Sequence, residues 1–190
     1  MKRSIVVFSL MAMSGLAFAD GFSYTYVQAT YGKVDVDNPA FSEDGDGLGV
    51  NGSFGITDNL NIVASFQTAD FDTIADADEI TVGLGVHAPI TEMFDIVAAV
   101  SYVDVDLAGF SDDGFELAGG VRFSVASAIE INGGITYRDL DLAGDDIGFG
   151  AGALYNFTDM FSVGLSAKWQ EKWGADTATY ALSGRINFGK

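Results

Sequence analysis

The residues best suited to specific chemistry are charged side chains that stand in otherwise apolar or glycine-rich stretches. They are Glu116, Arg122, Glu130, Arg138, Lys168 and Arg185. Carboxylates and guanidinium groups within reach of one another form strong, directional ion pairs. A tight turn at Ala126 would place Arg122 opposite Glu130 on neighbouring strands. The same pairing places Glu116 diagonally across from Arg138.

The remaining bases of this set also need acceptors. We expect Lys168 and Arg185 to reach Asp95, Gln28 or other polar residues on the same face. Two interpretations of these charges stay open: ion pairs that fill an interior, which we favour, and a charge-selective constriction. Glycines on the same face would leave room for water and so for a small aqueous path; they are Gly148, Gly150 and Gly152.

Most of the acidic residues fall in Asp- and Gly-rich segments between apolar stretches. The four main groups are Asp35, Asp37, Glu43, Asp44 and Asp46; Asp70, Asp72, Asp76, Asp78 and Glu79; Asp104, Asp106, Asp112 and Asp113; and Asp139, Asp141, Asp145 and Asp146. Ca²⁺ prefers such oxygen ligands, but no segment has the spacing of an EF-hand loop. A solvated anionic rim is the simpler interpretation. A divalent cation that bridges this rim to anionic lipid headgroups is a further hypothesis.

Residues for catalysis are scarce. The chain has one histidine, His87, and no cysteine. A nucleophile or general base needs an activating partner, and aspartates are too frequent here to single out a pair. We therefore predict that the protein is not an enzyme, that His87 is a hydrogen-bonding residue of the interior, and that there are no catalytic, cofactor-binding or metal-ligating residues and no cofactor.

The composition narrows the class of protein. The chain has 190 residues, 27 acids against 9 bases, 24 glycines, 22 Phe and Tyr residues and no cysteine. The acidic balance excludes a nucleic-acid binder that works through a basic face. The lack of cysteine excludes a disulfide scaffold and a zinc–thiolate site. A hydrophobic content of 48% excludes a disordered acidic tail.

The first 19 residues read as a secretory signal peptide. Lys2 and Arg3 precede a short apolar run, and Ala17-Phe18-Ala19 is an A-x-A cleavage site. We predict a signal peptide over residues 1–19 and one domain over residues 20–190. The alternative is an N-terminal helix that stays as an anchor. No later apolar stretch is long enough for a transmembrane helix.

The remaining chain alternates apolar with small or polar residues, which is typical of strands with two different faces. Short turns, three of them with the pattern [IF]-T-[DE]-x, alternate with wider segments near 38–47, 71–78, 107–114, 142–146 and 173–176. This spacing predicts ten strands, or eight if one hairpin lies outside the lipid. The expected strands are 22–37, 47–57, 59–70, 79–88, 93–106, 114–125, 128–141, 146–157, 160–172 and 177–188.

Aromatic residues on the apolar face gather near the two ends of the strands. Near the tight turns they are Phe54, Phe94, Phe123, Tyr155, Phe157, Phe161 and Phe188; near the wide segments they are Phe66, Tyr102, Phe115, Tyr137, Phe149, Trp169 and Tyr180. Two aromatic belts around an aliphatic band are typical of a transmembrane β-barrel. We predict a closed all-β, antiparallel up-and-down barrel with its apolar face outward. The alternative is a soluble, lipocalin-like barrel with an apolar interior.

Several segments resemble one known group. The A-x-A signal, GFSYTYVQATYGKVDVD, DGLGVNGSFGITDNLNIVASF and ATYALSGRINF are similar to the small outer-membrane β-barrel family of opacity-type surface proteins. The resemblance covers the whole mature chain. Barrels of this family usually end on an aromatic residue that the assembly machinery reads, whereas Gly189 and Lys190 follow Phe188 here.

These observations together predict a protein of the Gram-negative envelope. We expect an integral protein of the bacterial outer membrane, a monomer that contacts outer-membrane lipids, the barrel-assembly machinery during biogenesis and divalent cations at its acidic segments, and no nucleic acid. Its expected role is structural, or surface interaction through short acidic extracellular loops. The alternative is a narrow channel for small solutes or ions.

Overall fold

The described residues form ten strands and the turns between them. The structure, a computed structural model, describes residues 22–188 apart from 39–40, 72–75, 108–109 and 173–174. The strands are β1 (Tyr26–Asn38), β2 (Phe41–Gly55), β3 (Leu60–Phe71), β4 (Ala77–Thr91), β5 (Phe94–Leu107), β6 (Phe110–Ala126), β7 (Ile129–Leu140), β8 (Gly144–Asn156), β9 (Phe161–Lys172) and β10 (Ala175–Asn187). The predicted count of ten is confirmed. The signal peptide lies outside the described residues.

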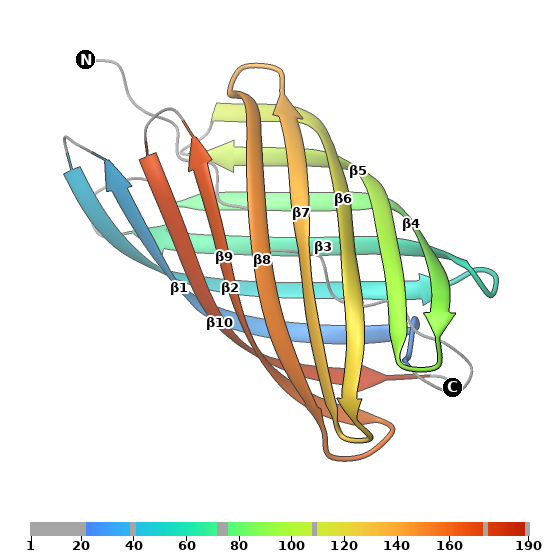
Figure 1. Cartoon of the computed structure of the whole chain (residues 1–190). Coiled ribbons are helices and arrows are strands. Elements are labelled where there is room, and N and C mark those ends of the chain that lie inside the picture. The colour runs from blue at the N-terminus through green and yellow to red at the C-terminus, as the bar shows by residue number, and fades with distance from the viewer. Residues whose placement is uncertain (1–21, 39–40, 72–75, 108–109, 173–174, 189–190) are drawn as a thin grey trace.

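Every strand pairs antiparallel with its neighbours in the chain, and β10 closes the barrel on β1 (Figure 1). In the closing pair, Tyr26 lies opposite Asn187 and Asp37 opposite Asp176. Closure leaves no free strand edge, which is a requirement for a sheet in lipid. In the part of the chain that the structure describes, no helix is long and apolar enough to cross a membrane.

The tight turns at one end share a threonine cap. The Thr57 hydroxyl accepts hydrogen bonds from the backbone N–H groups of Asn59 (3.3 Å) and Leu60 (3.1 Å). Thr158 accepts in the same way from Met160 (3.2 Å) and Phe161 (3.0 Å). A hydroxyl that satisfies backbone donors in this way stabilises a turn. The repeated Thr of the sequence pattern is therefore a turn cap.

The barrel exterior is apolar along the middle of the strands, as predicted. Examples of large exposed side chains are Val50, Phe66, Val82, Leu117, Ile135 and Leu182. Aromatic rings meet across neighbouring strands of the predicted outer belt, with centroids 6.4 Å apart for both Phe149–Trp169 and Trp169–Tyr180. The orientation of the two faces is thus confirmed over this part of the wall.

The alternation inverts at the other end of the barrel, where the sequence interpretation was wrong. The predicted wide loops are mostly strand: β1 continues to Asn38, β2 begins at Phe41 and β6 begins at Phe110. Here the acids point outward and the apolar residues inward. The outward acids include Asp35, Asp44, Asp70, Asp78, Asp113 and Asp145, and the inward apolar residues include Val34, Val36, Ala69, Ala77, Val103, Val105 and Leu140.

This inversion has a simple physical cause. Where the outer wall faces water instead of hydrocarbon, only the interior can bury apolar side chains. Val103, Val105, Leu140 and Ala143 form one buried cluster, which we call the outer cluster. The Asp112 carboxylate fixes the turn between β7 and β8 by accepting hydrogen bonds from the N–H groups of Leu142 (3.0 Å) and Ala143 (2.8 Å). The outer cluster therefore lines the inner face of β5 and β7 at the acidic end.

Candidate functional site in the barrel lumen

The lumen contains the charged residues that the sequence analysis singled out. The first pair is Arg122 on β6 and Glu130 on β7, joined by two bonds of 2.6 Å. The predicted partner is confirmed, but the two residues are not directly opposite. A register shift between Ser124 and Ala126 places Asn132 opposite Arg122, so the guanidinium reaches its partner diagonally.

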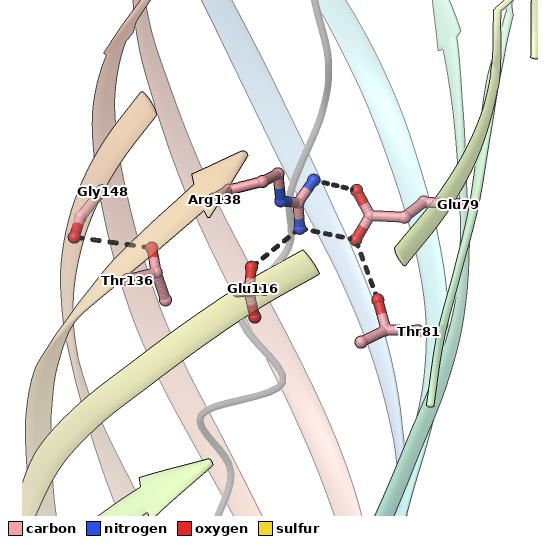
Figure 2. A network of polar contacts seen from close by, with 6 residues as sticks. All are labelled: Glu79, Thr81, Glu116, Thr136, Arg138 and Gly148. Carbon is pink, nitrogen blue, oxygen red and sulfur yellow. Dashed lines mark hydrogen bonds and ion pairs between the residues drawn. The ribbon is translucent and has the colours of Figure 1, made fainter. Parts of the chain in front are cut away.

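The second set crosses the middle of the lumen (Figure 2). Arg138 on β7 donates to Glu79 on β4 at 2.7 and 3.1 Å and to Glu116 on β6 at 2.8 Å. Glu116 lies directly opposite Arg138 in the register instead of diagonally. All three side chains are buried. A guanidinium held by two carboxylates therefore ties three strands together; we call it the central ion-pair group.

Glu79 is the functional residue that sequence reasoning missed, because it was grouped with the acids of a loop. A signal for it existed. Glu79 shares its alternation phase with Thr81 and His87, which the sequence placed on the inner face. The Thr81 hydroxyl lies 3.4 Å from Glu79 Oε1 and donates to it. The expected strand 79–88 already began at Glu79, so its alternation phase alone would have pointed the carboxylate into the lumen.

Two of the glycines that the sequence placed on the inner face lie close to neighbouring side chains. A Cβ added at Gly148 would lie 2.8 Å from Thr136 Oγ1 and 3.0 Å from Lys168 Cε. A Cβ at Gly152 would lie 2.9 Å from Asn132 Oδ1. Gly148 and Gly152 thus give space to larger residues of the facing strands.

Arg185 and Asp95 have separate partners. Arg185 Nε donates to Gln28 Oε1 at 2.9 Å, as predicted, and the guanidinium lies 4.3 Å above the centre of the Tyr26 ring. Asp95, another acceptor considered for Lys168 and Arg185, accepts a hydrogen bond from the Tyr24 hydroxyl at 3.3 Å. A cavity of about 50 Å³ beside Arg185 has room for very few water molecules.

His87 lies in the interior and forms a hydrogen bond there, as predicted. Its ring stacks on Tyr24 with centroids 3.4 Å apart and an interplanar angle of 9°. Its Nε2 contacts the backbone carbonyl of Asp58, and its own carbonyl accepts from the Asn59 amide at 3.1 Å. Both contacts fix the ring in the wall of the barrel near a tight turn.

The arrangement supports packing and charge neutralisation. Buried ion pairs whose hydrogen bonds are satisfied favour a single geometry. Removing one partner is destabilising, because the other charge then stays buried without a counter-charge. Among the residues that the structure describes, no three carboxylates or histidines come close enough together to hold a metal ion.

Comparisons with known proteins agree with this architecture. The family model described as "Outer membrane protein beta-barrel domain" matches residues 4–157. Among proteins with curated descriptions, none matches significantly. The KdgM porin, solved in complex with disordered oligogalacturonate, is 11% identical, with a TM-score of 0.50 over 86% of this chain and 99% of that one.

Two surface proteins are also similar in fold. Neisserial surface protein A is 14% identical, with a TM-score of 0.43 over 87% of this chain and 98% of that chain. Ail, the attachment invasion locus protein of Yersinia pestis, is 12% identical, with a TM-score of 0.42 over 87% and 99%. The family match spans most of the chain and agrees with the closed ten-stranded wall. The chain therefore belongs to the outer-membrane β-barrel family, whose place is the bacterial outer membrane.

Proposed function

We propose that this protein is an opacity-type surface barrel with a structural or surface-interaction role, and that its lumen is closed. The single observation that carries this proposal is the central ion-pair group, in which Arg138 bridges Glu79 and Glu116 across the lumen. A ten-stranded barrel is narrow compared with open porins, which have 16–18 strands. Side chains that bond across such a lumen leave little space for solutes.

The outer cluster supports the same proposal. Val103, Val105, Leu140 and Ala143 are almost fully buried on the inner face of the wall. Apolar side chains that line a lumen oppose the passage of water and ions. In this proposal, the central ion-pair group and this apolar lining together close the lumen. The proposal includes a non-enzymatic role, because the His87–Tyr24 stack and the Arg122–Glu130 ion pair are contacts typical of packing.

The acidic end is the part that would meet other molecules. Many of its carboxylates lie on the outward face of the strand ends, beyond the aromatic belt. In this proposal the signal peptide over residues 1–19 is removed, and the monomeric barrel is inserted by the assembly machinery and surrounded by outer-membrane lipids. Divalent cations screen the carboxylates against anionic headgroups.

Planar-bilayer recording tests this function. The refolded chain is expected to give no steady, reproducible current steps under conditions in which an open porin conducts. Heat-modifiable migration on gels would verify that the barrel is folded in the same preparation. Steady steps would overturn the closed lumen and favour the narrow channel.

A second experiment tests the surface role. Neutralising outward carboxylates of the acidic end, for example by Asp44→Asn and Asp78→Asn, should weaken Ca²⁺ binding while heat-modifiable migration stays unchanged. Isothermal calorimetry with Ca²⁺ and Mg²⁺ at millimolar concentrations should give heat. Its absence would remove the cation part of the proposal alone.

A further inference from the structure

The first described residues lie inside the barrel instead of in its wall. Residues 22–25 precede β1 and are not strand residues, although the sequence predicted a strand from residue 22. Phe22 and Tyr24 are 6% and 7% exposed, and Val97 on β5 packs against them. We call residues 22–25 the inner segment. Its aromatic side chains fill the end of the lumen opposite the outer cluster.

The inner segment contacts a pocket that three strands build. On β4, His87 stacks on the Tyr24 ring at 3.4 Å. On β5, Asp95 accepts from the Tyr24 hydroxyl at 3.3 Å. On β6, the Arg122 guanidinium carbon lies 4.6 Å from the centre of the Phe22 ring, within the range of a cation–π contact. Stacking, hydrogen bonding and charge thus all favour two aromatic side chains in this pocket.

Thr25 marks the place where this segment leaves the wall. Its Oγ1 accepts from the N–H of Gly55 on β2 at 3.2 Å, and its carbonyl accepts from the N–H of Phe188 at 2.8 Å. Thr25 is therefore hydrogen-bonded to β2 on one side and to the residue that follows β10 on the other. Rotation of the backbone before Thr25 would leave all the strand pairs of β1 in place, because these begin at Tyr26.

We propose that the inner segment is a hinged plug, which closes the inner mouth of the barrel by docking its two aromatic rings on His87, Asp95, Val97 and Arg122. Release of the plug exposes the polar lumen behind it to solvent on that side. The plug precedes the first strand, whereas the residues of the central ion-pair group lie on strands of the wall.

Thiol labelling tests the plug directly, since the chain has no cysteine of its own. Val97→Cys places a thiol under the plug, and Ser127→Cys places one in the exposed β6–β7 turn as a reference. In folded barrels, a hydrophilic maleimide should label position 97 at least about ten-fold more slowly than position 127, because labelling follows the open fraction. Adding Phe22→Ala and Tyr24→Ala should remove most of that protection.

A matched control removes an aromatic ring without touching the plug. Phe54 is an exposed exterior residue on β2, so Phe54→Ala should leave position 97 protected. Equal labelling of positions 97 and 127 with the plug intact would overturn the proposal, and this comparison does not depend on the folding of the double variant. Unchanged protection in a folded double variant would also overturn it. Bilayer currents report on the central lumen separately, so the two proposals can fail independently.

Discussion

Arg138 and Glu79 form a two-bonded ion pair across the lumen although β5 and β6 lie between their strands. The pair joins residues 59 positions apart in the sequence. It therefore restrains the cross-section of the barrel in a way that the ladder of neighbouring strands cannot. Glu116 completes the group from the intervening strand β6.

Replacing Arg138 by Ala should destabilise the barrel strongly. The substitution leaves two buried carboxylates without their guanidinium, which typically costs roughly 3–5 kcal/mol. Urea unfolding in detergent micelles would measure the free energy of unfolding. Lys33→Ala is the matched control, because Lys33 pairs with Asp46 on the exposed exterior. An equal effect of the two substitutions would contradict the role of the central ion-pair group.

The Arg122–Glu130 pair should behave as one unit. Arg122→Ala and Glu130→Ala are each expected to lower the unfolding temperature, and the double variant should lose less than the sum of the two. For residues in direct contact, the interaction energy from such a cycle is about 0.5–3 kcal/mol. Simple additivity of the two effects would show that the contact contributes no stability.

Glycines of the inner and outer faces should respond differently to a methyl group. Gly148→Ala brings a Cβ to within 2.8 Å of Thr136 Oγ1, and overpacking of this kind costs about 1–3 kcal/mol. A Cβ at Gly119 meets nothing within 4 Å, so Gly119→Ala should be neutral. Unfolding midpoints in urea compare the two variants. A neutral Gly148→Ala would indicate a lumen with free space.

Two opposite substitutions at neighbouring positions test the inverted alternation at the acidic end. Val103→Asp introduces a charge into the outer cluster and should destabilise by roughly 2 kcal/mol or more. Asp104→Val changes the neighbouring, outward position in the opposite sense and should have a small effect. Both variants can be compared by thermal melting in the same detergent. A larger loss for Asp104→Val would place the apolar face outside at this level too.

Much of this architecture could be predicted because it depends on local patterns. The period-two alternation and the capped turns define the strands, and Thr57 and Thr158 are bonded as the repeated turn pattern suggests. The Arg122–Glu130 partnership followed from one short turn. Its diagonal geometry did not, since a register shift at Ser124 has no evident signature in the sequence.

Contacts between distant strands could not be read in the same way. Whether Glu79 reaches Arg138 depends on the cross-section of the closed barrel, which no single hairpin specifies. The inner segment was assigned to a strand because Phe22 and Tyr24 continue the alternation of β1. The wide loops were overestimated because acids and glycines are typical of loops, whereas here they lie on strands whose outer face meets water.

The orientation of the wall, apolar outside and polar within along its middle, underlies every proposal above. Size-exclusion chromatography with light scattering and circular dichroism, run on residues 20–190 before and after detergent removal, tests it most directly. A barrel with this exterior should be folded and monodisperse in detergent and should aggregate once the detergent is withdrawn. A chain that remains folded and monodisperse in plain buffer would contradict it.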